Sequence, residues 1–218
     1  MRLGISSYTY TWAVGVPGCP PERPLKAVDL LDKAANAGVY MVQIADNLPL
    51  DRLSSDELDA FARRASDLNI VIEVGTRGIS NDNLRTYLRL AERLKSPILR
   101  VVIHTPDYNP TEDEIVNTIK AIIPEFERAG ICLAIENHDA LPVKTLARII
   151  ERIDSEYAGI CLDTGNSFGA LEGPEAVLET LGHLTVNLHI KDYSVYRARY
   201  IMGLLIEGRP AGKGQLDI

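Results

Sequence analysis

The sequence predicts an α/β fold, a barrel of the TIM (β/α)8 type in which seven strands are visible and the eighth is missing from the chain. Two observations lead to this prediction. Apolar runs alternate with amphipathic stretches along the whole chain, as in a parallel sheet with helices outside it. Polar side chains recur where the runs end, which is typical of the active rim of such a barrel. We take residues 1–218 as a single, incomplete barrel domain.

The expected strands are the apolar runs themselves. They begin near Leu3, Val39, Ile70, Ile98, Ile131, Gly159 and Thr185. Polar residues stand near their ends, at Ser6, Ser7, Asp46, Glu73, His104, Glu136, Asp163, His189 and Lys191. The first run is followed by a stretch expected to be a loop. An open nucleotide-binding sheet is a weak alternative, because no G-x-G-x-x-G follows the first run and the chain has no P-loop.

The first helices lie between these runs. Residues 24–37 form one, which Gly38 ends. The next begins behind a serine cap at Ser54 or Ser55 and reaches Leu68. Residues 81–95 carry leucines at helical spacing and form a third.

Three more helices are expected in the second half of the chain. Thr111 caps a helix whose first turn is acidic, as the helix dipole favours. Pro142 begins a helix that reaches Arg152, and Pro174 begins another that reaches Leu181.

Composition excludes several classes of protein. The hydrophobic fraction of 46% and the charged fraction of 24% are those of an ordinary globular chain. A formal net charge of -7 argues against binding nucleic acid through its phosphates. We expect no membrane partner, since no apolar run reaches the roughly 20 residues that cross a bilayer. The N-terminus does not resemble a signal peptide and the three cysteines suggest no disulfide framework, so we expect a cytoplasmic protein. Cys132 and Cys161 lie within apolar runs, and we expect them to be small core residues.

Three side chains at the ends of successive apolar runs carry the chemistry. Glu136 lies in ICLAIEN (131–137), Asp163 in GICLDTGN (159–166) and His189 in VNLHIKD (186–192). Parallel strands of a barrel bring their carboxyl ends to one site. Two carboxylates and an imidazole form a binding set for a divalent metal, although each could instead serve as an ion-pair partner, a turn cap or a core histidine.

In order, the motifs IENH (135–138), LDTGN (162–166) and HIKD (189–192) resemble the xylose isomerase-like TIM barrel superfamily, and most of all its sugar isomerase and epimerase branch. The resemblance implies a Mn²⁺, Mg²⁺ or Co²⁺ ion held by a Glu, an Asp, a His and a second Glu. The first three roles fall on Glu136, Asp163 and His189. The second Glu belongs on an eighth strand. Residues 212–218 resemble the segment that precedes it, so we expect the protein to continue past Ile218.

The chemistry agrees with the resemblance. A divalent metal neutralises the negative charge that develops on the oxygens of a sugar enediolate. Oxygen ligands with one imidazole suit Mn²⁺ best, then Mg²⁺ or Co²⁺, with Zn²⁺ less expected. Glu136 is a candidate catalytic base. Lys191 lies two residues after His189 and faces the same side of the strand, so it is a second catalytic candidate or the partner of a carboxylate.

Five further residues are candidates for substrate binding. His104 ends the fourth strand, and His138 follows the fifth, where it could also support the metal ligands. Glu73 ends the third strand. Tyr8 and Trp12 follow the first strand and could form a wall over a sugar, or could simply pack.

The favoured function is a metal-dependent isomerase or epimerase of carbohydrate metabolism, acting on a small keto sugar through an enediolate. The first alternative is a lyase, a dehydratase or decarboxylase of a 3-oxo sugar acid that uses the same metal chelate. The second is a non-catalytic sugar-binding barrel or an inactive fragment. A three-zinc endonuclease needs more than the four histidines present. The sequence leaves a homo-oligomer open.

Overall fold

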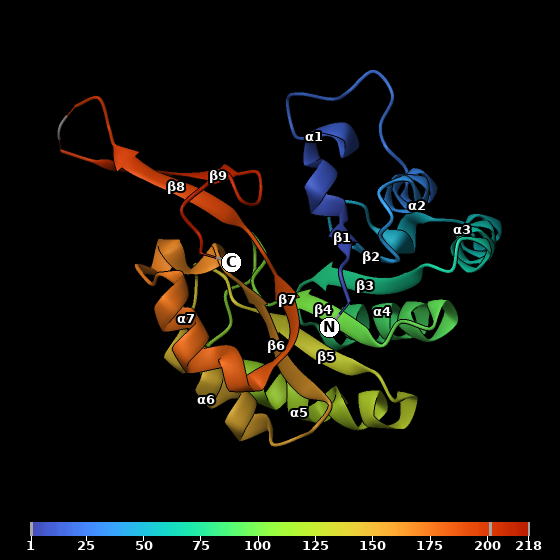
Figure 1. Cartoon of the computed structure of the whole chain (residues 1–218). Helices are drawn as coiled ribbons and strands as arrows, with labels where there is room; N and C mark the ends of the chain where they lie inside the picture. The colour runs from blue at the N-terminus through green and yellow to red at the C-terminus, as the bar shows by residue number, and fades with distance from the viewer. Residues whose placement is uncertain (1, 201, 218) are drawn as a thin grey trace.

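The computed structural model of the chain describes residues 2–200 and 202–217 (Figure 1). Seven parallel strands pair in chain order, from β1 to β7, in one sheet that curls into a half-barrel. Its strands are β1 (Ile5–Ser6), β2 (Met41–Ile44), β3 (Val71–Arg77), β4 (Ile98–Val102), β5 (Cys132–Glu136), β6 (Ala158–Asp163) and β7 (Thr185–His189). The predicted fold class is confirmed, with β1 and β7 as the two edges of the sheet over the described residues.

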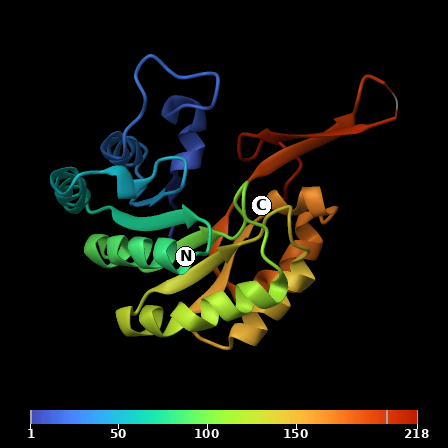
Figure 2. The same cartoon turned by 180° about the vertical axis from the view of Figure 1, so that it is seen from behind.

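Helices follow the strands and lie on the outer face of the curled sheet (Figures 1 and 2). They are α2 (Ala27–Asn36), α3 (Ser55–Asp67), α4 (Asn81–Leu94), α5 (Glu112–Ala129), α6 (Val143–Ile153) and α7 (Pro174–Leu181). Short 3-10 segments are η1 (Ser7–Tyr10), η2 (Leu50–Arg52), η3 (Asn166–Ala170) and η4 (Gly182–Leu184). None of the helices in the described ranges has the length and apolar content needed to cross a membrane.

Side-chain caps fix the starts of α3, α4 and α5 where the sequence predicted them, whereas α2 begins at Ala27 and not at residue 24. Ser54 caps α3 in a capping box with Glu57, and Thr111 caps α5 in the same way with Glu114. Gly130 ends α5 in the left-handed conformation, at φ 66°. Such caps are local signals, which explains why the helix boundaries could be predicted.

Within the described residues, two apolar clusters form the interior. The large one fills the space between the sheet and its helices, where leucine, isoleucine and valine side chains of both layers meet. The small one lies on the inner face of the sheet and consists of Ile98, Ala134 and Cys161. Above it, the inner face becomes polar. The face of the sheet that packs against the helices is therefore apolar, and the polar candidate site lies on the inner face, at the carboxyl ends of the strands.

Strand register aligns the predicted ligands. Glu136 on β5 pairs with Cys161 on β6, and Asp163 on β6 pairs with His189 on β7. On β7, Asn187 and His189 face inward, while Leu188 between them faces outward and is 37% exposed. The alternation of a strand thus puts the imidazole on the same inner face as the two carboxylates.

The structure adds elements that the sequence analysis did not predict. After β7, an antiparallel hairpin of β8 (Asp192–Arg197) and β9 (Leu204–Arg209) projects from the carboxyl end of the sheet (Figures 1 and 2). Most of its side chains are exposed, including the apolar side chains of Leu204, Leu205 and Ile206 on β9. The stretch after β1, expected to be a loop, forms η1 and the short helix α1 (Thr11–Val14).

Candidate metal centre

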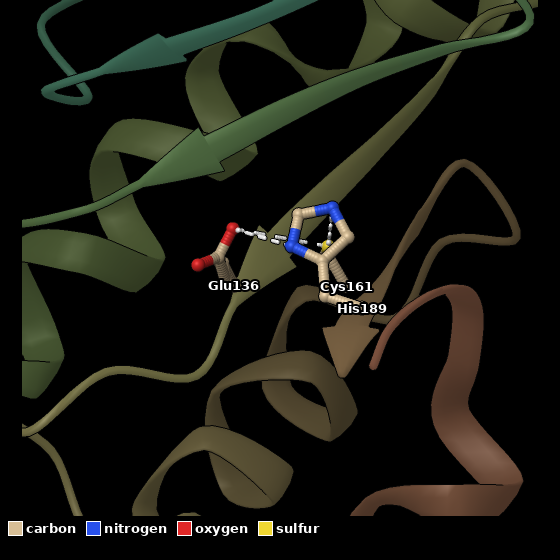
Figure 3. A group of neighbouring side chains, drawn as sticks. All are labelled: Glu136, Cys161 and His189. Carbon is tan, nitrogen blue, oxygen red and sulfur yellow. Dashed lines mark hydrogen bonds and ion pairs between the residues drawn. The ribbon is translucent and has the colours of Figure 1, made fainter. Parts of the chain in front are cut away.

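The structure brings the three predicted metal ligands together. His189 Nδ1 lies 3.4 Å from Glu136 Oε2 and 3.7 Å from Asp163 Oδ2. Both carboxylate side chains are almost fully buried. Figure 3 shows the imidazole ring beside the Glu136 carboxylate at the inner edge of the sheet. The convergence follows from the register of β5, β6 and β7; the ligand roles of these residues stay predictions.

Gln43 on β2 sets the orientation of the imidazole. Its amide nitrogen donates to Glu73 and Asn187, so its Oε1 is the atom that lies 2.9 Å from His189 Nε2. An oxygen acceptor at this nitrogen assigns the ring proton to Nε2. The lone pair of Nδ1 then faces two carboxylates. That arrangement fits a bound cation, the partner that all three groups share.

Asp163 supplies a second sign of a cation site. Its Oδ1 accepts from the backbone N–H groups of Gly165 and Asn166, at 2.8 and 3.0 Å. Its Oδ2 is buried and has no hydrogen bond, although Lys191 Nζ lies 3.0 Å away. Burial alone would raise the pKa of Asp163, but neighbouring donors outweigh it, Lys191 and the Gly165 N–H among them, and the pKa is lowered. A buried, ionised oxygen that faces an ammonium but accepts no well-directed hydrogen bond suits a metal ligand.

Asn137 fixes the two carboxylate-bearing strand ends to each other. It is fully buried. Its Oδ1 accepts from the Asp163 N–H at 2.6 Å, and its amide donates to the Asp163 carbonyl and to Ser167 Oγ, both at 2.9 Å. The side chain therefore replaces ladder hydrogen bonds where β5 and β6 end. Sequence analysis passed over this residue.

Arg100 is a second residue that the sequence analysis missed. It points inward from β4 and is 3% exposed. Its Nε donates to Glu136 Oε2, and its Nη1 lies 2.7 Å from Asp46 Oδ1. Burial lowers the pKa of Arg100, but Glu136 and Asp46 raise it by more, so the guanidinium stays charged. The available signal was an arginine in the middle of an otherwise apolar strand, ILRVV.

Cys161 lies behind the imidazole ring (Figure 3). Its Sγ is 3.5 Å from His189 Nε2 and 3.9 Å from Glu136 Oε2, so these three residues form a group of potential metal ligands. Burial raises the pKa of the Cys161 thiol well above its ordinary value, with Glu136 adding to the effect. A protonated thiol is a poor metal ligand. We assign Cys161 to the inner apolar cluster, as the sequence predicted a core role.

Lys191 borders the predicted ligands from the segment after β7. Its Nζ donates to Asn166 Oδ1 at 2.6 Å, and Asn166 in turn donates to Glu136 Oε1 at 2.6 Å. Half of the Lys191 side chain is exposed. Asn166 thus joins the ammonium to the carboxylate that the sequence predicted to be catalytic.

Two predicted substrate residues, His104 and His138, follow the ends of β4 and β5. Burial lowers the pKa of His104, and the charges of His138 and Arg77 lower it further. Arg77 donates to the His104 carbonyl at 3.2 Å and pairs with Asp46 at 3.0 Å. His138 Nδ1 lies 3.8 Å from Asp139. Their substrate roles stay predictions.

The remaining three substrate candidates lie in different surroundings. Tyr8 donates to Asp46 at 3.1 Å, and its ring lies 5.9 Å from the Arg100 guanidinium, so it borders the site. Trp12, on α1, is 73% exposed.

Glu73 is buried one layer beneath the rim. Its carboxylate accepts from Gln43 and Asn187, and burial raises its pKa. Asn187 lies two residues before His189 on β7 and so one layer below the rim. Because Glu73 is hydrogen-bonded to Asn187, it lies in that lower layer and not at the rim position expected for it.

Comparisons with known proteins agree with this geometry. The family model of xylose isomerase-like TIM barrels matches residues 31–218. The 3-oxo-isoapionate decarboxylase of Pectobacterium atrosepticum is 35% identical over 219 aligned residues, covering 100% of this chain and 78% of that protein. The sequences share this similarity along the whole chain.

Solved structures show the same fold. A xylose isomerase-like TIM barrel protein from Mycobacterium smegmatis in complex with magnesium has a TM-score of 0.71 and 15% identity, covering 99% of this chain and 82% of that one. D-psicose 3-epimerase has a TM-score of 0.69 and 17% identity, covering 87% and 73%. The chain belongs to the xylose isomerase-like TIM barrel family.

Proposed function

We propose that this chain carries the metal centre of a lyase that decarboxylates a 3-oxo sugar acid. The observation that carries the proposal is its 35% identity with 3-oxo-isoapionate decarboxylase along its whole length. The sequence alone favoured an isomerase or epimerase and kept this lyase as an alternative. The likeness to D-psicose 3-epimerase, at 17% identity, is one of fold. The lyase is therefore the better supported reaction.

The charges around the centre favour an anionic substrate. Three carboxylates, of Asp46, Glu136 and Asp163, are paired with the cations Arg77, Arg100 and Lys191. A divalent metal would make this balanced set positive, and the fourth carboxylate that the family resemblance implies would still leave an excess positive charge. Such a site favours a sugar acid over a neutral keto sugar.

Glu136, Asp163 and His189 would hold the metal, and their oxygen and imidazole donors suit Mn²⁺ or Mg²⁺. When bound, such an ion would stabilise negative charge on the oxygen of the 3-oxo group. Gln43 supports this role by keeping the Nδ1 lone pair of His189 directed at the carboxylates. Asn137 holds Asp163 in place by hydrogen bonds to its backbone N–H and carbonyl groups.

The chain's own residues account for the proton balance. In a 3-oxo acid the bond between the carboxylate carbon and C2 breaks, CO₂ leaves, and the electron pair moves through C2 onto the 3-oxo oxygen as an enolate. C2 must then gain a proton. We assign its delivery to the Lys191 ammonium, which is half exposed and can recover a proton from water. Glu136, held by Arg100 and Asn166, keeps the reacting group oriented.

The test compares acids with neutral sugars. The protein, supplied with Mn²⁺, is assayed for CO₂ release from 3-oxo sugar acids and for solvent proton exchange into neutral keto sugars. We expect CO₂ release, and we expect Lys191→Met to lower kcat/KM by about 100-fold, as loss of a general acid does. Lys144→Met, on the exposed face of α6, is the matched control. Proton exchange into keto sugars without CO₂ release from any acid would replace the lyase by an epimerase.

A further inference from the structure

A cavity of about 280 Å³ lies between η3 and the β8–β9 hairpin. Lys191 and Gly165 belong to its wall, and both also border the predicted metal centre: Lys191 Nζ is 3.0 Å from Asp163 Oδ2, and the Gly165 N–H donates to Asp163 Oδ1. A molecule in the cavity that contacts the Lys191 ammonium is thus separated from the predicted metal centre only by this side chain. No sequence motif pointed to this space, because the hairpin that forms one of its walls was not predicted.

The lining combines apolar and hydroxyl-binding groups. Phe168 and Tyr193 meet edge to face, with ring centroids 4.6 Å apart, and provide an aromatic wall. The Asp139 carboxylate, 58% exposed, also lines the cavity and can accept hydrogen bonds. Aromatic faces cover the C–H groups of a carbohydrate while carboxylates accept from its hydroxyls. The volume lies just below the roughly 300 Å³ at which drug-sized pockets begin, which suits a short polyol.

We propose that this cavity binds the hydroxylated carbon chain of the substrate, the part remote from the reacting carbons. The substrate class rests on the proposed function, whereas the cavity itself does not. The Lys191 side chain would then lie between the two ends of the substrate and contact both, the reacting end on one side and the hydroxylated end on the other. The cavity therefore sets which sugar acids fit, and the hairpin is the element that decides it.

The hairpin offers a substitution that fills the cavity without a clash. Gly208 on β9 lines the space, and a Cβ added there meets no atom within 4 Å. Ile206, two residues earlier, lines it too, so this face of β9 is the one turned toward the cavity. Leu205 lies on the opposite face and is 46% exposed. Gly208→Leu fills the cavity, and Leu205→Trp adds bulk to the same strand outside it.

Binding is measured by calorimetry on the Mn²⁺-loaded protein with two unreactive acids. Erythronate carries a hydroxylated chain, whereas glycolate has only the chelating end. We expect erythronate to bind the unaltered protein more tightly than glycolate. Gly208→Leu should weaken erythronate by about tenfold, the scale of displacing a small group from its pocket, and leave glycolate unchanged. Asp139→Asn should weaken erythronate in the same way, and Leu205→Trp should leave both unchanged.

Three results would overturn the assignment: erythronate that binds no better than glycolate, a Gly208→Leu protein with unaltered erythronate affinity, or an equal loss in Leu205→Trp. The last would mean that the hairpin as a whole, and not the cavity, matters. The decarboxylase proposal is judged separately by CO₂ release from the unaltered protein. Failure of one therefore leaves the other standing.

Discussion

Gln43 on β2 and His189 on β7 are hydrogen-bonded across the inside of the half-barrel, with Oε1 and Nε2 2.9 Å apart. Their strands are not neighbours in the sheet, and the residues are separated by 146 positions in the chain. The contact exists because the sheet curls until β7 faces β2. It fixes the ring so that Nδ1, and not Nε2, points at Glu136 and Asp163.

Gln43→Ala should therefore weaken metal binding without removing a ligand. Loss of a partner of a metal-bound histidine typically costs about 10- to 100-fold in affinity. Calorimetric titration with Mn²⁺ measures the effect, and His183→Ala, a histidine in η4 at the start of β7, is the control. An unchanged dissociation constant in Gln43→Ala would show that the imidazole needs no orienting partner.

Glu136→Gln should reduce turnover more than it weakens substrate binding. The amide keeps the shape of the side chain but loses the charge that neutralises Arg100 and contributes to the metal set. Steady-state kinetics separate kcat from KM, with exposed Glu156→Gln as the control. If only the melting temperature moves and kcat stays constant, Glu136 is a structural residue.

Arg100→Met should destabilise the metal-free protein by roughly 3–5 kcal/mol, because it leaves buried Glu136 without its counter-charge. Urea unfolding measures the loss. Arg64→Met is the matched control, since its pair with Asp32 is exposed and should be worth about 1 kcal/mol at most.

The double variant Arg100→Met with Glu136→Gln tests the cause of that loss. It should recover part of the stability, since the uncompensated charge is then gone. A double variant no more stable than the sum of the two single losses would show that Arg100 acts through its packing alone.

Asp192 should make the order of the C-terminal segment dependent on pH. Burial raises the pKa of Asp192, but the backbone N–H groups of Leu216, Gly214, Tyr193 and Lys213 outweigh it and hold the pKa below its ordinary 3.8. A lowered folded-state pKa gives stability that is present above the unfolded pKa and is lost as pH falls through the folded one.

The amide chemical shifts of Gly214 and Leu216 report on this contact. They should stay constant down to about pH 4 and move cooperatively below it, given the ordinary value of 3.8. Asp192→Asn should abolish the transition, and Asp107→Asn, at an exposed carboxyl, should leave it in place. A transition that persists in Asp192→Asn would assign it to another group.

The strands, most helix boundaries and the three predicted metal ligands could be predicted from the sequence because their causes are local. Caps such as Ser54 and Thr111 mark helix starts within four residues. Glu136, Asp163 and His189 each end an apolar run, and parallel strands in chain order bring such ends to one edge. The hairpin was not predicted, because the apolar run 204–206 at the start of β9 is too short to be assigned to a strand by periodicity alone, and its side chains are exposed.

The sequence by itself thus determined the class of fold and which side chains stand at the strand ends. Only the tertiary structure decided how they are held. Arg100 joins Glu136 to Asp46, Gln43 orients His189, and Asn187 holds Glu73 below the rim. These pairs cross the inside of the curled sheet between residues far apart in the chain. Curvature and register set such distances, and neither the period nor the composition of a single strand encodes them.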